Sequence, residues 1–187
     1  MTDFTLSSGS ICRPYRSPWG AFPTRTMPTP STLAATITLG QPVSLLADTS
    51  TNAGTLIGVA NNAPNMTNLV GIAAEAASTG TSSAVAGPSL SVWEANPAVE
   101  FKAVTKLGTI GSSLVGKRRS LVWDSTLNIA WVDVTTSTAT DWRVVVTGIV
   151  DGDGDSGGYV AFRFLAETGS QINSTILSST PLLAFYS

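Results

Sequence analysis

The chain has 187 residues with a net charge of −2, and it contains 43% hydrophobic residues, 12% charged residues and no histidine. The length fits one domain with an appendage, and the hydrophobic share is enough for a sizeable core. The absence of histidine excludes most hydrolase triads and most zinc or iron sites, because histidine is the commonest general base and metal ligand. The negative net charge provides no overall basic field for binding nucleic acid.

The only cysteine is Cys12, so no intrachain disulfide framework exists. The N-terminus has no charged region followed by an apolar run, and we therefore expect no signal peptide. No run reaches the roughly 18 apolar residues that a membrane-spanning helix needs. We expect a chain made in the cytoplasm that has no cofactor, no membrane partner and no nucleic-acid partner.

Residues 1–32 are predicted to form an extended N-terminal arm. The segment 14–30 carries five prolines. Since proline lacks a backbone donor and fixes φ, neither a helix nor a central strand fits. The arm also carries aromatic and arginine side chains, which are typical of binding hot spots. We expect it to lie on a neighbouring subunit or on a different protein, and the alternative is a disordered leader. The candidate binding residues are Arg13, Tyr15, Arg16, Trp19, Phe22 and Arg25.

Residues 33–187 are predicted to form one all-β domain, a β-sandwich or barrel-like fold of about eight or more short strands. Apolar residues alternate with polar ones in residues 99–103 and 160–164, and this period of two indicates half-buried strands. Many short strands separated by turn signals are typical of sandwiches and barrels. The sequence shows little evidence for helix, and we expect very little helix in the chain.

Two further elements are expected in the second half of the chain. The apolar stretches 121–123 and 129–132 flank a short polar loop, which predicts a hairpin. Trp142, Val144 and Val146 alternate in the strand that follows. The tail 168–187 is expected to add a final strand or to dock on a neighbouring subunit.

The string Gly-Asp-Ser-Gly-Gly at 154–158 matches the nucleophile motif of chymotrypsin-like serine proteases. In those enzymes a histidine takes the proton of the serine, and Ser156 has no histidine available to it. We therefore interpret the string as a glycine-rich turn between two strands. No catalytic residue is predicted, and the chain is not expected to be an enzyme.

Asp151, Asp153 and Asp155 have the spacing of the first calcium ligands in an EF-hand. The glycine of that motif is replaced by Ser156, and its bidentate glutamate is replaced by Phe162. We predict no metal site, with weak cation binding of another kind as the alternative.

Other motifs also have simpler interpretations. Residues 111–118 resemble a phosphate-binding loop, but Arg118 stands where a serine or threonine would hold Mg²⁺, and the required helices are missing. The basic run 117–119 is interpreted as a solvated strand end rather than a contact for nucleic acid or an acidic partner. Tryptophans in alternating strands are expected to pack in the core or an interface rather than to line a sugar-binding face; these are Trp93, Trp123, Trp131 and Trp142.

An ordered series of glycine, apolar and acidic residues extends over about residues 38–166. It includes Gly40-Gln-Pro-Val-Ser-Leu, Val92-Trp-Glu-Ala-Asn-Pro and Gly157-Gly-Tyr-Val-Ala-Phe. In this order of features the chain resembles the small capsid decoration (cement) proteins of tailed phages. The resemblance implies a β-rich homotrimer on the outer surface of the virion head, which binds the major capsid protein and strengthens the shell.

On this hypothesis the arm binds the major capsid protein or a neighbouring trimer. Deleting residues 2–30 is then expected to leave a folded oligomer that no longer binds heads. Two other classes remain open as alternatives: a different virion component, such as a tail or fibre protein, and a carbohydrate-binding module with aromatic rings exposed on one face.

Overall fold

The computed structural model describes residues 11–29, 36–45, 56–58, 68–78, 89–106, 108–135 and 143–165. These residues form short strands and one short 3₁₀ helix, and the all-β prediction is confirmed. The elements are β1 (Arg13–Arg16), β2 (Thr24–Pro28), β3 (Thr36–Ile37), β4 (Pro42–Leu45), β5 (Leu56–Gly58), β6 (Leu69–Ala73), β7 (Ala77–Ser78), β8 (Ser89–Glu94), β9 (Glu100–Thr105), η1 (Ser112–Leu114), β10 (Arg118–Asp124), β11 (Ile129–Asp133), β12 (Val144–Ile149) and β13 (Gly158–Phe164).

Five strands close into a barrel in the order β9, β11, β10, β12 and β13, because β13 pairs back onto β9. The β9–β11 pairing is parallel, and the other four are antiparallel. Alternate residues of each strand point into the barrel. Phe101, Phe162 and Phe164 meet there, with ring centroids 5.0 to 5.9 Å apart. Burial of each ring stabilises the fold by about 1.5–3 kcal/mol.

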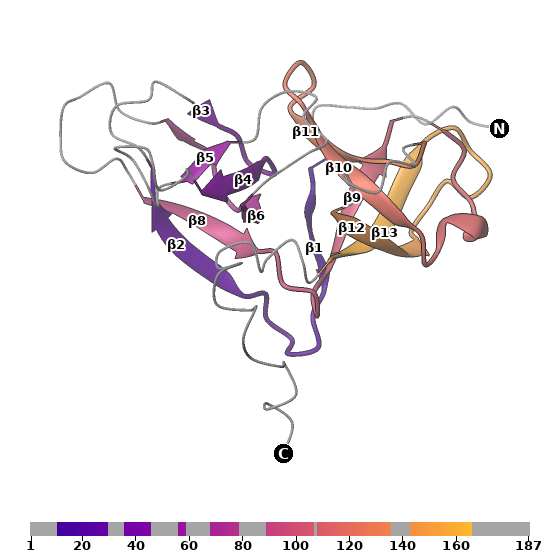
Figure 1. Ribbon diagram of the computed structural model, residues 1–187, viewed down its shortest axis with the longest axis horizontal. Helices are drawn as coiled ribbons and strands as arrows, with labels where there is room; N and C mark the ends of the chain where they lie inside the picture. The colour runs from indigo at the N-terminus through magenta and orange to yellow at the C-terminus, as the bar shows by residue number, and fades with distance from the viewer. Residues whose placement is uncertain are drawn as a thin grey trace, which may run out of the picture.

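A second, five-stranded sheet is antiparallel throughout, in the order β2, β8, β6, β4 and β5. In its central strand, Leu69 and Ile72 belong to the hydrophobic cluster of the barrel, whereas Val70 and Ala73 belong to a separate cluster. The central strand is therefore buried on both faces, and one of its faces is continuous with the barrel core. Figure 1 shows the two groups of strands side by side, with β1 between them.

The alternation predicted from the sequence is confirmed in the barrel. In β9, Phe101 and Ala103 are buried, while the alternating residues Glu100 and Lys102 are partly exposed. The predicted hairpin is the β10–β11 pair, in which Leu121 lies opposite Val132. Trp142 and the tail 168–187 lie outside the described residues.

The N-terminal segment differs from the separate arm that the sequence suggested. Residues 13–16 form β1, which pairs with β9, and residues 24–28 form β2, which pairs with β8. Both are edge strands of this chain's own sheets. The prolines do exclude helix and central strand, as predicted, but an edge strand tolerates the missing donor of Pro14 or Pro28.

This arrangement also corrects the expectation for the 2–30 deletion. That deletion removes two strands together with Cys12 and Met27, whose side chains are buried in the two hydrophobic clusters. Removing buried side chains leaves cavities and exposes the remaining core. The truncated chain is therefore expected to lose stability, and tests of the segment require point substitutions.

Candidate binding surface

The six residues predicted to bind a partner lie on one continuous segment, made of β1, the connection 17–23 and β2. Arg13, Arg16, Trp19, Phe22 and Arg25 are exposed, and Tyr15 is half-buried. The connection crosses from the barrel side to the second sheet at the bottom of Figure 1. Trp19 and Phe22 both lie within it, and Trp19 keeps 60% of its surface exposed. Large apolar groups held in water mark a candidate contact surface.

An ion-pair network borders this connection where β1, β9 and β13 meet. Arg163 Nη2 donates a hydrogen bond of 3.4 Å to Glu100 Oε1, and Arg16 Nη1 lies 4.0 Å from Glu100 Oε2. The Glu100 side chain is only 13% exposed, whereas those of Arg16 and Arg163 are 71% and 45% exposed. Each guanidinium has five N–H donors, so donors beyond those directed at Glu100 remain available.

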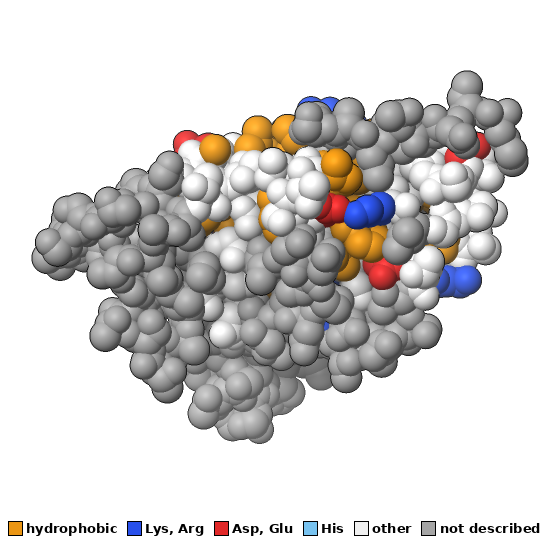
Figure 2. Space-filling model, turned by 90° about the horizontal axis from the view of Figure 1, so that it is seen from above, with side chains coloured by type: hydrophobic (Ala, Val, Ile, Leu, Met, Phe, Trp, Pro, Cys, Tyr) orange, Lys and Arg blue, Asp and Glu red, His pale blue; other side chains and the backbone are white. Residues whose placement is uncertain are grey.

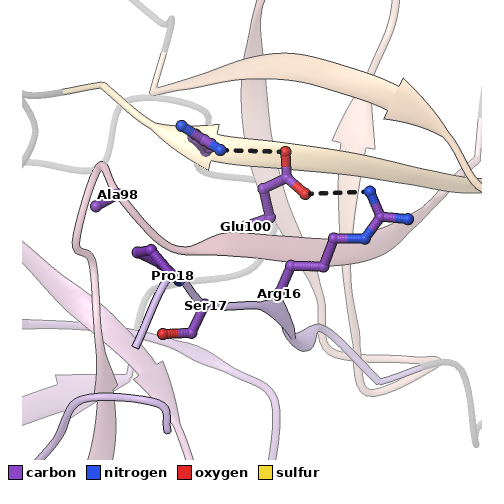
Figure 3. Close-up of a pocket in the computed structure, with 6 residues that line it drawn as sticks. Arg16, Ser17, Pro18, Ala98 and Glu100 are labelled. Atoms are coloured by element: carbon purple, nitrogen blue, oxygen red, sulfur yellow. Dashed lines mark hydrogen bonds and ion pairs between the residues drawn. The ribbon is translucent and has the colours of Figure 1, made fainter. Parts of the chain in front are cut away.

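These residues line an open pocket of about 420 Å³, together with Ser17, Pro18 and Ala98. Figure 3 shows Glu100 joined to Arg16 by a dashed line, with Ser17 and Pro18 following Arg16 and Ala98 beside Pro18. Pro18 directly precedes the exposed Trp19, so the pocket and the exposed aromatic side chain are adjacent. We call the six lining residues the basic pocket, because two arginines accompany one carboxylate.

Aromatic and basic side chains extend from the pocket along the outer face of β1, β9 and β13. Lys102 Nζ lies 5.6 Å from the Tyr15 ring centroid and 5.3 Å from that of Tyr159. The Arg16 guanidinium lies 4.8 Å from the Tyr15 ring. Contacts of this kind contribute about 0.5–1 kcal/mol each at exposed sites. The two Lys102 contacts link Tyr15 of β1 to Lys102 of β9 and Tyr159 of β13.

The glycine-rich turn predicted at 154–158 is present in the connection between β12 and β13. Gly152 and Gly154 have φ of +76° and +86°, which favours glycine at both positions. Ser156 is exposed within this turn. The described residues contain no group of three or more potential metal ligands, and this includes Asp151, Asp153 and Asp155. Lys117 and Arg118 are exposed at the start of β10.

The tryptophans are distributed differently from a sugar-binding face. Trp123 and Trp131 are buried, and Trp93 is partly buried against the barrel core. Trp19, which the sequence assigned to the arm, is the exposed one among the described residues. Among the described residues on the face shown in Figure 2, charged side chains are few, and near its middle an acidic group lies beside a basic one, surrounded by apolar and uncharged polar groups.

Comparison of the chain with protein-family models, with curated proteins and with solved structures finds no match. Within the described residues, no helix has both the length and the apolar character needed to cross a membrane.

Proposed function

We propose that this chain is a non-enzymatic structural protein of a virion. In this proposal it binds the outside of a tailed-phage head as a homotrimer and stabilises the shell by contacting the major capsid protein. The proposal rests on the sequence resemblance and on the exposed segment between β1 and β2.

The observation that carries the proposal is the exposure of Trp19 and Phe22 between Arg16 and Arg25 on one surface segment. Tryptophan and arginine are the residue types most enriched among binding hot spots. Strands β1 and β2 hold both ends of this segment on the two sheets, so a partner meets a preorganised surface and less entropy is lost on binding. Three such segments in one trimer engage a shell together, and their combined avidity exceeds the affinity of one segment.

Two observations favour a binding protein over the other classes. The residues that line the basic pocket include no histidine or cysteine, and Ser156 lies in a turn rather than in that pocket. The carbohydrate-binding alternative needs several aromatic rings on one exposed face, but Trp123 and Trp131 are buried. A tail or fibre component is the second candidate, because it needs the same exposed surface and differs only in its place on the particle.

The test uses phage shells that lack a decoration protein, with binding measured by co-sedimentation. Trp19→Ser and Phe22→Ser together are expected to reduce binding at least about tenfold, since each side chain supplies apolar contact area to the interface. Thr126→Ala, in the exposed β10–β11 turn, is the matched control and is expected to bind as the wild type does.

Circular dichroism and a thermal melt establish that the double variant is folded. Equal binding by the folded double variant would contradict the assigned surface. Absence of wild-type binding to heads, combined with binding to tails or fibres, would favour the second candidate.

A further inference from the structure

Exposed apolar side chains occur at two separate places on the described surface. Three large hydrophobic residues are exposed there: Trp19, Phe22 and Val115, the last with 47% of its surface accessible. Trp19 directly follows Pro18 of the basic pocket and Phe22 lies in the same connection, whereas Val115 follows η1 elsewhere on the barrel. Single exposed apolar residues are common, so their meaning depends on the charged groups that accompany them.

Val115 lies at the end of the barrel that carries the turn between β12 and β13, residues 151–157, which we call the acidic loop. Backbone hydrogen bonds of 2.8 and 2.9 Å join this loop to Ile110, from Gly154 N to Ile110 O and from Ile110 N to Asp155 O. A Cβ on Gly111 would lie 3.7 Å from Asp153 Oδ1, so the segment leading to Val115 borders the acidic side chains.

The acidic loop is ordered but its outer carboxylates are not engaged in ion pairs. Asp151 Oδ1 accepts a hydrogen bond of 2.5 Å from Tyr159 N, which holds the base of the loop. Asp153 is exposed and Asp155 is half-buried. The ion pairs within the described residues involve Glu100 and Asp124 and leave both of these carboxylates unpaired.

The basic pocket and the acidic loop lie at opposite ends of the same pair of strands. Gly158, where the loop ends, is opposite Thr105 at the end of β9. Glu100 and Arg163, in the basic pocket, are at the other end of β9 and β13. Five residues of strand separate the two ends, or about 17 Å at a rise of 3.3–3.4 Å per residue. No single chain can therefore place its own acidic loop in its own basic pocket.

We propose that the basic pocket of one copy of this chain binds the acidic loop of a second copy. Asp153 of the second copy pairs with Arg16 and Arg163 in the pocket, and Val115 packs against Trp19. The pocket then contributes Trp19 beside positive charges, and the loop region contributes Val115 beside a negative charge. Apolar groups flanked by complementary charges are typical of protein interfaces. The inference rests on that part of the proposed function in which copies associate, and it requires no contact with a phage head.

This contact is heterologous, because it joins two different surfaces of the same chain. Repetition of a heterologous contact gives a closed ring when the rotation between copies closes, and an open chain when it does not. Since exposed charge pairs carry much of the contact, self-association is expected to weaken strongly between about 0.05 M and about 0.5 M salt.

Sedimentation velocity of the purified full chain tests the contact without any shell. Arg16→Asp and Asp153→Arg are each expected to weaken self-association at least about tenfold, because each places like charges opposite one another. The double variant carrying both changes is expected to recover it. Thr126→Asp and Thr126→Arg introduce the same two charged side chains in the β10–β11 turn, with half the change in net charge, and are expected to associate as the wild type does.

A mixture of the two single variants provides the decisive measurement. The pocket with Arg16→Asp is complementary to the loop with Asp153→Arg. The unchanged pocket of the Asp153→Arg variant is likewise complementary to the unchanged loop of the Arg16→Asp variant, so only contacts between identical variants place like charges opposite one another. The mixture is therefore expected to recover association, in assemblies in which the two variants alternate, whereas each variant alone is expected to associate much more weakly than the wild type.

Three results would overturn the inference: a wild type that is monomeric at all concentrations in low salt, single variants that associate as strongly as the wild type, or a double variant that shows no recovery. Thermal melts check that every variant is folded. Because shells are absent, none of these results decides whether the chain binds a head, which the Trp19 and Phe22 substitutions test separately.

Discussion

Phe101 on β9 and Phe162 on β13 lie directly opposite each other in the strand pairing that closes the barrel, with ring centroids 5.9 Å apart. Phe164 packs edge-on against both rings. The three side chains are fully buried. They connect the two strands on which the basic pocket is built, so the position of the site depends on their packing.

Phe162→Ala is expected to lower the free energy of unfolding by about 3–5 kcal/mol, because the substitution removes buried area and leaves a cavity between two other rings. Phe162→Leu keeps most of the volume and is expected to cost less than Phe162→Ala. Urea denaturation monitored by tryptophan fluorescence measures both. A loss below about 1 kcal/mol for the alanine variant would show that the barrel is not packed as described.

Gly71→Ala is expected to destabilise the second sheet by about 1–3 kcal/mol, the usual cost of overpacking. A Cβ at Gly71 would lie 2.0 Å from the carbonyl oxygen of Trp93, so β6 or β8 must shift to accommodate it. Gly148→Ala in β12 is the matched control, because the nearest atom to its Cβ is 3.9 Å away. Equal melting temperatures for the two variants would contradict the close approach of β6 and β8.

The barrel strands could be predicted from the sequence because apolar and polar residues alternate along them in the same way as buried and exposed side chains do in the structure. Val160, Phe162 and Phe164 point inward, and Arg163 between them is exposed. The strand order has no such local signal. The parallel pairing of β9 with β11 joins residues about 27 positions apart, Val104 with Trp131, and depends on the packing of the whole barrel.

The candidate site was only partly predictable, because part of it is assembled by strand register, which the sequence does not show. Arginine and aromatic side chains identify Arg16 and Trp19 from sequence alone. Glu100 and Arg163 were missed as members of the site, because the sequence shows them only as the outward-facing residues of two strands. Register brings these two residues together with Arg16, and the one available signal was their common position on the polar face of adjacent strands.

Asp124→Asn is expected to cost about 1.5–3 kcal/mol at neutral pH, the range for a hydrogen bond to a charged group. The hydrogen bond from Lys106 lowers the pKa of Asp124, and bonds from the N–H groups of Leu127 and Thr126 add to the effect against the opposing effect of burial. The asparagine keeps an oxygen that can accept the two backbone bonds, so the variant isolates the charge.

The pH dependence of the same pair has a defined sign. Because the pKa of Asp124 is lowered on folding, its contribution is present above the unfolded value of about 3.9 and is lost as pH falls through the folded pKa. Urea titrations at several pH values are therefore expected to show the wild-type advantage over Asp124→Asn shrinking below about pH 4. A constant difference down to strongly acidic pH would contradict the Lys106 pairing.

Cys12 is expected to reduce stability at high pH, because burial raises the pKa of its thiol far above the ordinary value. The unfolded thiol ionises above about pH 8.5 while the folded thiol keeps its proton, so stability is lost as pH rises, by up to about 1.4 kcal/mol per pH unit. Cys12→Ala removes the group, and the wild type is expected to lose stability more steeply than this variant between about pH 9 and 10.5 in urea titrations. Because the two proteins differ only at residue 12, the difference between the two slopes reports on Cys12. The native thiol is also expected to react with a thiol reagent at pH 8 only after denaturation. Rapid stoichiometric reaction of the native protein would mean that Cys12 is not buried in the barrel cluster as described.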